Sequence, residues 1–503
     1  MRNDFSPLAK VLGISLVSCL CLYRLASATP LQIIHTNDLH SHFEKGENPT
    51  RGHYAAVKAV IDRLKADADD KIIETLVVDS GDFSEGSQFY LADKGELSWK
   101  AMNLMGYDAV VLGNHDYLAG PLALDRILKN ASPDFFLLGA NVKNKNVRPR
   151  ARIERNGDWV SIIGLTTDSP DYSWRLGEKL ITSPKKSVEK LVPKYRKDSH
   201  FVIALSHLGL SADRKLVRET KGIDLIIGGH SHDALYVPVF EPAKDGAKVP
   251  IVQAGQNGEY VGDLLVDLVP GKPVKILRYQ LIPVDIDGPK DAEMLGFVEE
   301  ARRRLEKNYP APWLYQQIAY SEVPVLRPEN GKSVWGDIIG KGMLLVSKAH
   351  LAINSADLFG DNLPAGPITR ETLMQYFPRV FEFQPVTLGW TVWSAEVEGF
   401  VLKRFLQEAI RRGLDVSLSG GSLDIKYKNG SPQISNFKVR GKKACNFCVY
   451  KIALPEGIAR VVGNDYYLQR LLDDIKSTRY SMWTALELQL KKMGGIVKTA
   501  ASE

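Results

Sequence analysis

The chain has 503 residues, of which 44% are hydrophobic and 25% are charged, and its formal net charge is +6. This is ordinary globular composition, ample for a buried core, and the length predicts about three domains. The charge is mild and no run of Lys and Arg forms a binding patch, so the composition argues against a nucleic acid polymer or a membrane surface as partner.

The first 28 residues have the pattern of an export signal. Basic residues precede an apolar run, Val11–Tyr23, and small residues follow it at Ala26-Ser27-Ala28. The run is shorter than the ~20 residues of a membrane-spanning helix. A second interpretation stays open, because Leu16-Val17-Ser18-Cys19 resembles a bacterial lipoprotein box, in which Cys19 carries lipid. We expect an exported protein, periplasmic or extracellular, with a membrane-anchored lipoprotein as the alternative.

Two of the four cysteines lie in this signal, and the other two form Cys445-Asn446-Phe447-Cys448. The C-x-x-C spacing is compatible with a redox motif, half of a zinc site or a short disulfide. No second C-x-x-C accompanies it, and exported proteins fold in an oxidising compartment. We therefore expect a structural disulfide between Cys445 and Cys448.

Short apolar runs alternate with helical patterns from residue 31 to about residue 285. The expected strands are Leu31–His35, Leu76–Asp79, Ala109–Leu112, Phe135–Ala140, Ser161–Leu165, Phe201–Leu205 and Asp224–Ile227. Amphipathic helices are expected between several of them, at His53–Lys65, Leu97–Met105 and Ser187–Tyr195. Strands buried on both faces, with helices between them, predict a layered α/β domain.

The remaining chain divides at a polar, helix-prone stretch. This stretch, Asp291–Lys307, stops at Pro310-Ala311-Pro312 and predicts a linker helix. In the region that follows we expect a helix at Ala395–Arg411 and strands at Ser435–Val439 and Val449–Leu454. The predicted organisation is an export signal at 1–28, an α/β domain at 29–287, a linker helix at 288–312 and a smaller α+β domain at 313–503.

Five polar clusters follow expected strands of the first domain. They are Asp38-Leu39-His40, Gly81-Asp82, Gly113-Asn114-His115-Asp116, Ser206-His207 and Gly228-Gly229-His230-Ser231-His232. Ligands in α/β folds bind at the carboxyl ends of strands, and glycines beside the polar residues let the backbone turn sharply. Two divalent ions ~3.5–4 Å apart need a bridging carboxylate with imidazole, carboxylate and amide ligands. Each motif alone is weak, but together they predict a dinuclear site for manganese, zinc, iron or a mixture.

These motifs resemble those of the calcineurin-like metallophosphoesterase superfamily. The longer stretches Ile34-His35-Thr36-Asn37-Asp38-Leu39-His40-Ser41-His42 and Asp79-Ser80-Gly81-Asp82 are similar to the 5'-nucleotidase / 2',3'-cyclic phosphodiesterase family. The resemblance is strong over residues 31–262 and fainter from 315 to 465. It implies a β-sandwich flanked by helices, followed by a linker helix and a C-terminal substrate domain.

The resemblance also implies a role for each polar residue. Asp38, His40 and His232 would hold one metal; Asn114, His207 and His230 would hold the other; and Asp82 would bridge them. A metal-bound water would attack phosphorus in line. His115 would stabilise the developing phosphoryl charge or help the leaving oxygen depart. Asp116 is expected to stabilise its loop.

One departure from the family pattern concerns His115. Nucleotidases have an aspartate three residues after this histidine, and that aspartate orients the ring. Leu118 occupies the position here. We therefore expect His115 to lack its orienting partner.

Further departures gather in the C-terminal domain. Phe359 stands where the family has an arginine, although Leu363-Pro364-Ala365-Gly366-Pro367-Ile368-Thr369 keeps the family's sequence. Pro378-Arg379-Val380-Phe381 replaces a Pro-Phe-x-Asn motif whose aromatic ring stacks on a base, and Asn464-Asp465-Tyr466-Tyr467 lacks the family's glycine loop. Because tight nucleoside sites need aromatic and polar groups that converge, we expect a different substrate. Phe359, Arg379 and Phe381, with Tyr466 and Tyr467, are the candidates for its pocket, and the alternative that they are core and surface residues stays open.

The sequence thus predicts a dinuclear-metal-dependent hydrolase of small phosphoesters, 5'-nucleotidase-like but with altered specificity. Two alternatives stay open. One is a related hydrolase that removes sulfate from the thiol of a carrier protein, and the other is a metal-binding module that has lost catalysis. The complete set of polar ligands argues against the second alternative. The oligomeric state is not predicted.

Overall fold

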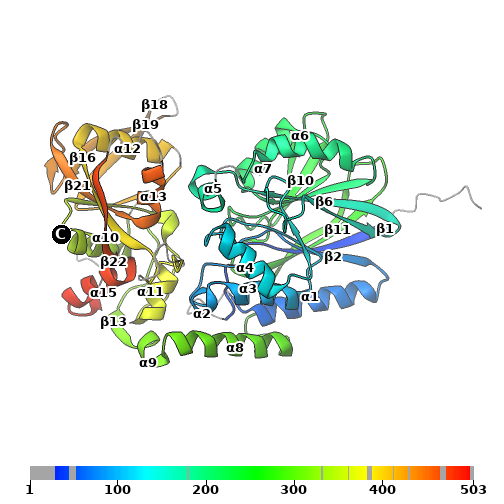
Figure 1. Ribbon diagram of the computed structural model, residues 1–503, viewed down its shortest axis with the longest axis horizontal. Coiled ribbons are helices and arrows are strands. Elements are labelled where there is room, and N and C mark those ends of the chain that lie inside the picture. Colours follow the sequence, from blue (N-terminus) through cyan, green and yellow to red (C-terminus); the bar gives the residue numbers. More distant parts are fainter. Residues whose placement is uncertain are drawn as a thin grey trace, which may run out of the picture.

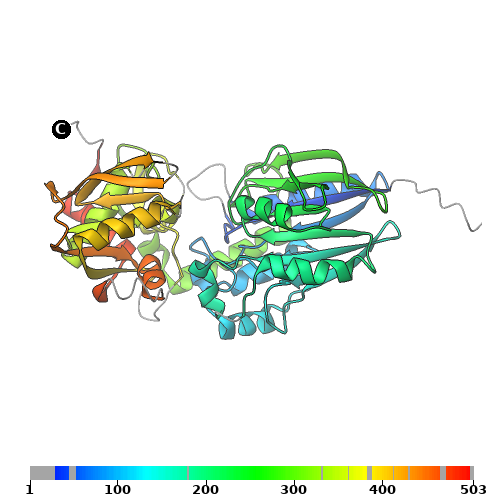
Figure 2. The same ribbon diagram turned by 90° about the horizontal axis from the view of Figure 1, so that it is seen from above.

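The structure is a computed structural model that describes residues 29–44, 52–177, 180–329, 332–360, 362–381, 388–411, 413–428, 431–464 and 472–498. The expected export signal and residues 465–467 lie outside these ranges. Figure 1 shows a larger lobe built from the N-terminal half of the chain and a smaller lobe built from the C-terminal half. The two lobes also lie side by side when seen from above (Figure 2).

The larger lobe is a sandwich of two six-stranded sheets with the orders β12-β11-β1-β2-β3-β4 and β5-β6-β7-β8-β10-β9. Strands β1 to β4 are parallel, and so are β6, β7, β8 and β10. The bounds are β1 (Thr29–Thr36), β2 (Glu74–Asp79), β3 (Ala109–Val111), β4 (Phe136–Leu138), β5 (Arg150–Arg155), β6 (Asp158–Thr166), β7 (Phe201–His207), β8 (Leu225–Gly228), β9 (Val239–Pro242), β10 (Lys248–Val252), β11 (Tyr260–Leu268) and β12 (Lys275–Pro283).

Helices cover the outer faces of the sandwich. They are α1 (Tyr54–Asp69), α3 (Glu96–Met105), α4 (Pro121–Ala131) and α8 (Ala292–Asn308) on the side of the first sheet, and α6 (Pro184–Tyr195) and α7 (Leu210–Glu219) on the side of the second. The short helices α2 (Tyr90–Asp93) and α5 (Pro170–Leu176) lie at the end that faces the smaller lobe (Figure 1). The layered α/β prediction is therefore confirmed.

Strands of this sandwich are buried on both faces, as their unbroken apolar runs predict. The neighbours Ile33 and Ile34 illustrate this, because both are fully buried but belong to different cores. Ile33 packs between the two sheets with Val78 and Ile203, whereas Ile34 packs on the helical side. Each of the seven strands expected in this lobe is present and overlaps its expected range.

The smaller lobe contains a five-stranded sheet in the order β17-β14-β21-β16-β22 and two three-stranded sheets, β15-β13-β23 and β18-β19-β20. Its strands are β13 (Gln317–Ser321), β14 (Leu351–Ser355), β15 (Gly366–Thr369), β16 (Thr391–Glu398), β17 (Val416–Ser419), β18 (Gly421–Lys428), β19 (Ser431–Val439), β20 (Lys442–Lys443), β21 (Val449–Pro455), β22 (Asp473–Ser481) and β23 (Ile496–Val497). Its helices are α9 (Ala311–Leu314), α10 (Val334–Ser347), η2 (Ala356–Leu358), α11 (Arg370–Tyr376), α12 (Gly399–Arg411), α13 (Glu456–Asn464) and α15 (Met482–Lys492).

The expectation of one helix over Ala395–Arg411 is wrong at its start. Residues up to Glu398 belong to strand β16, which pairs with β21 on one side and β22 on the other, and the helix begins only at Gly399. The strand has the period of two that a sheet requires, since Ala395 and Val397 are buried while Glu396 and Glu398 are exposed. The strands expected at Ser435–Val439 and Val449–Leu454 are confirmed within β19 and β21.

Helix α8, the helix expected at Asp291–Lys307, leads from the larger lobe to the smaller one (Figure 1). Asp291 caps it by accepting a 2.8 Å hydrogen bond from the backbone N–H of Met294. The helix has 17 residues and is therefore about 26 Å long. Among the described residues, no helix has the length and apolar character needed to cross a membrane.

The disulfide loop packs on the start of helix α12. Cys445 and Cys448 are bonded to each other, with their Cα atoms 5.3 Å apart. The backbone N–H groups of Gly399 and Phe400 donate hydrogen bonds to the carbonyls of Cys448 and Asn446, at 3.0 and 2.9 Å. The loop therefore satisfies donors that the first turn of a helix leaves without an intrahelical partner.

A buried histidine marks the centre of the first sheet. His35 on β1 is fully buried, and neither of its ring nitrogens has a hydrogen-bond partner within the described parts of the chain. Its ring stacks on Tyr279, with the ring centres 6.2 Å apart, and lies so close to Gly262 that a methyl group there would come within 2.0 Å of Nε2. Burial lowers the pKa of His35 to about 4, against a smaller opposing effect of the Asp263 charge.

This buried ring predicts a loss of stability in acid. Above the unfolded-state pKa of about 6.5 the ring is neutral in both states, and below it only the unfolded chain takes up a proton. Urea unfolding at about pH 7.5 and about pH 5 should show the wild type losing roughly 2 kcal/mol more than His35→Leu over this interval. Equal losses in the two proteins would contradict the assignment of acid sensitivity to His35.

Candidate metal centre

The predicted ligands come together where parallel strands of both sheets end. Asp38 and His40 follow β1, Asp82 follows β2, Asn114 follows β3, His207 is the last residue of β7, and His230 and His232 follow β8. All but His230 and His232 are buried. Side chains that are far apart in the sequence therefore share one small volume at the end of the sandwich that faces the smaller lobe (Figure 1).

The backbone is strained at five of these seven positions. The φ angles of Asp38, His40, Asp82, His230 and His232 are 52°, 49°, 60°, 76° and 61°, all in the left-handed region. Residues with a Cβ adopt this region at a cost of roughly 1–3 kcal/mol each, so they persist there only where the surroundings fix them. Such a concentration of strained residues is typical of a functional site.

A glycine allows two of these loops to touch. Gly113 lies against the loop after β2, and a Cβ atom at this position would come within 2.3 Å of both the backbone nitrogen and the Oδ1 atom of Asp82. The backbone N–H of His115 then donates a 2.6 Å hydrogen bond to the same Oδ1 atom. The glycine in the Gly-Asn-His motif is therefore required for close approach to a carboxylate.

Asp38, His40 and His232 form one group of donors. Nε2 of His40 lies 3.2 Å from Nε2 of His232, and Oδ1 of Asp38 lies 3.4 Å from Nε2 of His232. Nδ1 of His40 lies 2.7 Å from the carbonyl oxygen of Glu85, which can only accept a hydrogen bond, so the ring proton belongs on Nδ1. Nε2 of His40 thus offers a lone pair to the centre of the group.

Asp82, His207 and His230 form a second group, which Asn114 joins. Nε2 of His207 lies 2.9 Å from Oδ2 of Asp82 and 3.2 Å from Oδ1 of Asn114. Nδ1 of His207 donates a 2.6 Å hydrogen bond to the carbonyl of Ser80. Asp82 also lies within reach of His40, so its carboxylate neighbours both groups.

The protonation states suit divalent cations. Burial lowers the pKa of His40 well below its ordinary value and, with the charge of His207, lowers the pKa of His230 to about 4, so both imidazoles are neutral. Burial of Asp82 favours its protonated form, but the charge of His207 outweighs it and lowers the carboxyl pKa. Burial works against the charge on His207, but Asp82 raises its pKa to about 10. A proton on His207 thus supplies positive charge that a bound cation would replace, and this donor set fits divalent ions.

Asp116 joins two of the ligand-bearing loops, which confirms the expectation that it stabilises its loop. Its carboxylate accepts four backbone hydrogen bonds of 2.8–3.1 Å, from the N–H groups of Gly113, Asp82, Phe83 and Ser84. The first belongs to the loop after β3 and the other three to the loop after β2. Burial, together with the nearby charge of Asp82, raises the pKa of Asp116 to about 7.

The expectation that His115 lacks a carboxylate partner is wrong. Leu118 makes no such contact, but Oε2 of Glu85 lies 2.5 Å from Nδ1 of His115. Glu85 is 1% exposed, and the ring of His115 meets that of His40 edge to face at 4.8 Å. Burial works to lower the pKa of His115, but the charges of Asp82 and Glu85 outweigh it and raise the pKa. The sequence analysis did not identify Glu85 as a site residue. The one signal that pointed to it was its position three residues after Asp82, in the same loop.

The three residues expected to bind substrate lie in different surroundings. Phe359 is 3% exposed and packs on the rings of Tyr376 and Phe377, inside the smaller lobe. Phe381 instead faces the larger lobe, where the Arg175 guanidinium lies 4.5 Å from its ring centre. Arg379 donates a 2.8 Å hydrogen bond to the carbonyl of Asp357, and its positive charge acts on the pKa of His115. Arg379 and Phe381, unlike Phe359, therefore lie beside the centre.

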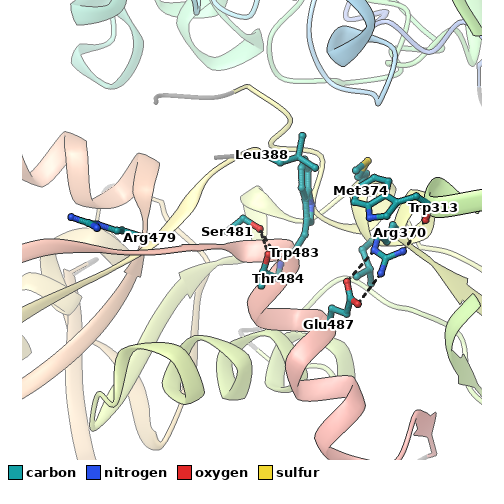
Figure 3. A pocket seen from close by; sticks show the side chains of 10 residues that line it. Trp313, Arg370, Met374, Leu388, Arg479, Ser481, Trp483, Thr484 and Glu487 are labelled. Carbon is teal, nitrogen blue, oxygen red and sulfur yellow. Dashed lines mark hydrogen bonds and ion pairs between the residues drawn. The ribbon is translucent and has the colours of Figure 1, made fainter. Parts of the chain in front are cut away.

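A separate cavity of about 270 Å³ lies in the smaller lobe, between α11 and α15 (Figure 3). Trp313, Met374 and Trp483 form part of its wall. Arg370 forms a 3.0 Å ion pair with Glu487 in this wall, which also contains Arg479. None of the candidate ligands lines this cavity.

Comparison with known proteins agrees with this geometry. Residues 31–234 match the family model described as calcineurin-like phosphoesterase. The 5'-nucleotidase of Mus musculus is 25% identical, with 94% of this chain and 90% of the mouse protein covered. The solved structure of a 5'-nucleotidase precursor from Thermus thermophilus superposes with a TM-score of 0.78 at 24% identity, covering 93% of this chain and 97% of that one.

A second solved structure, the sulfate thiohydrolase SoxB of Thermus thermophilus, superposes with a TM-score of 0.74 at 19% identity, covering 94% of this chain and 96% of that one. At the 24% and 19% identities of these two solved structures, the likeness concerns the fold alone. The chain therefore contains a calcineurin-like metallophosphoesterase domain, has 5'-nucleotidase homologues that match most of its length, and is assigned to the metal-dependent phosphoester hydrolases.

Proposed function

We propose that the protein is an exported hydrolase that uses two divalent ions to cleave small phosphoesters other than ordinary 5'-mononucleotides. Asp38, His40 and His232 hold one ion in this proposal. Asn114, His207 and His230 would hold the other, and Asp82 neighbours both sets of ligands. The observation that carries the proposal is the meeting of these seven side chains at the ends of five parallel strands. Manganese, zinc, iron or a mixture all suit this donor set.

Each protein group has a distinct task. Divalent ions held here would neutralise phosphoryl charge and supply a nucleophile at neutral pH. Histidine rings are held by hydrogen bonds to backbone carbonyls, from His40 to Glu85 and from His207 to Ser80, so their Nε2 atoms point inward. His115, whose Nδ1 faces Glu85, uses Nε2 to stabilise the phosphoryl group or to protonate the leaving oxygen.

The surroundings of the centre support an altered substrate. Phe359, which occupies the position of an expected arginine, is buried among aromatic rings and offers no charge to a nucleotide. Phe381 is 6% exposed and contacts Arg175 and Tyr90, so it presents little free face on which a base could stack. Arg379 places a positive charge near His115, and this charge works to lower the pKa of His115. A phosphoester recognised mainly through its phosphoryl group fits these surroundings best.

Export is proposed from the basic, apolar and small-residue pattern of residues 1–28 and from the disulfide between Cys445 and Cys448. A mature protein in the periplasm or outside the cell would meet small phosphoesters there. The alternative is that lipid is attached to Cys19. Mass spectrometry of the mature N-terminus distinguishes a lipid-bearing Cys19 from cleavage after Ala28.

The metal centre predicts the effect of removing one ligand. Asn114→Ala, in protein lacking residues 1–28 and supplied with manganese, should lower phosphate release more than about 100-fold, because loss of a ligand disturbs one ion directly. Asn130→Ala is the matched control, since Asn130 is an exposed residue of α4 that bonds Glu96. Asn114→Ala with wild-type turnover, or wild-type turnover that persists in excess chelator, would contradict the proposal.

The substrate preference is tested by measuring kcat/KM for a panel of substrates. 5'-AMP should be a poorer substrate than an aryl phosphate, a diaryl phosphate or a 2',3'-cyclic nucleotide, because the buried Phe359 supplies no cation. Efficient and selective hydrolysis of 5'-AMP would overturn the altered specificity. Turnover of an S-sulfonated thiol, with none of any phosphoester, would overturn the phosphoester assignment.

A further inference from the structure

Glu85 makes three contacts that join separate parts of the molecule. Its Oε2 atom lies 2.5 Å from Nδ1 of His115, in the loop after β3. Its Oε1 atom accepts a 3.1 Å hydrogen bond from the backbone N–H of Phe381, which belongs to the smaller lobe. Its main-chain carbonyl accepts from Nδ1 of His40 at 2.7 Å, in the loop after β1. One residue thus contacts two histidines of the centre and the opposite lobe.

These contacts require a carboxylate. The backbone of Phe381 can only donate, and Nδ1 of His115 must donate to a carboxylate oxygen, so both partners need an acceptor. The two oxygens of a carboxylate provide two acceptors, whereas an amide of the same shape provides one acceptor and one donor. Glu85 is 1% exposed, so water does not replace a missing acceptor there. A buried carboxylate is fixed in position when each of its two oxygens accepts a hydrogen bond from a neighbour.

The contact with Phe381 reaches the smaller lobe at a well-packed point. Phe381 is 6% exposed, and its ring centre lies 6.2 Å from that of Tyr90 and 4.5 Å from the guanidinium of Arg175. Both of these residues belong to the larger lobe. The residue whose backbone N–H donates to Glu85 is therefore packed against the larger lobe.

From these contacts we propose, on the basis of the proposed phosphoester hydrolysis, that Glu85 is a positioning residue that orients His115 toward the substrate and makes this orientation depend on contact with Phe381 of the smaller lobe. Nδ1 of His115 is held by Glu85, which leaves Nε2 as the nitrogen that faces the reacting group. The smaller lobe then contributes to turnover through the backbone N–H of Phe381, in addition to any contact that it makes with the substrate.

The kinetic test separates positioning from general destabilisation. Glu85→Ala should lower kcat about 10- to 100-fold with KM unchanged, the usual cost of losing a residue that orients a functional histidine. The loss should be larger for an alkyl phosphate than for a nitrophenyl phosphate, because the less basic aryl oxide needs less help to leave. Glu371→Ala is the matched control, since it removes another contact between the lobes, the 2.8 Å hydrogen bond from Gln88. It should keep the wild-type kcat.

A double variant shows whether Glu85 acts through His115. If it does, the variant with both Glu85→Ala and His115→Ala should be no slower than His115→Ala alone, because the partner of Glu85 is already absent. Losses that multiply would overturn the proposal. So would a Glu85→Ala enzyme that matches the Glu371→Ala control. Glu85→Gln, which keeps the volume but offers a single acceptor, serves if Glu85→Ala does not fold, and the same losses are expected of it.

Hydrogen exchange provides a readout that needs neither metal nor substrate. In metal-free protein the amide of Phe381 should exchange faster in Glu85→Ala than in wild type, and at the wild-type rate in Glu371→Ala, as measured by mass spectrometry of peptides that contain this amide. Unchanged exchange in Glu85→Ala would overturn the link between the lobes. A wild type without phosphoester turnover would overturn the proposed function, and the exchange result would still decide whether Glu85 holds Phe381.

Discussion

The larger lobe is organised around buried negative charge. Asp38 and Asp82 are almost completely inaccessible to water, and a carboxylate in that position is costly unless positive charge or hydrogen-bond donors surround it. The chain provides donors through His207, through the backbone N–H of His230 and through that of His115. The strained left-handed residues and the close approach of Gly113 follow from the need to bring these groups together.

Parallel strands make this convergence possible. The carboxyl ends of β1, β2 and β3 lie at one edge of the first sheet, and those of β7 and β8 lie at the same end of the second. Each strand needs to carry only one or two polar residues beyond its last apolar position. Asp116 then holds the loops after β2 and β3 together through four backbone hydrogen bonds, so the ligands lie on a rigid frame.

Sequence reasoning predicts the parts of this arrangement that depend on local pattern. Apolar runs such as Phe201–Leu205 identify strands because the strands are buried on both faces, and the polar residues just after them are easily recognised. The spacing of residues along the sequence does not predict which distant segments come into contact. The hydrogen bond from His115 to Glu85, which takes the place of the bond to the family's aspartate, joins two loops whose relative position only the packed sheets determine. The boundary between β16 and α12 is ambiguous for a different reason, since the apolar Ala395 and Val397 suit either a strand or a helix.

The disulfide loop also has a consequence for the order in which the chain matures. The carbonyls of Asn446 and Cys448 hold the first turn of α12, and the bond between Cys445 and Cys448 keeps these carbonyls in a tight loop. In a reducing compartment the bond does not form, so the start of α12 is held less firmly there than in an oxidising compartment. Completion of the smaller lobe is thereby coupled to the place in which the protein folds.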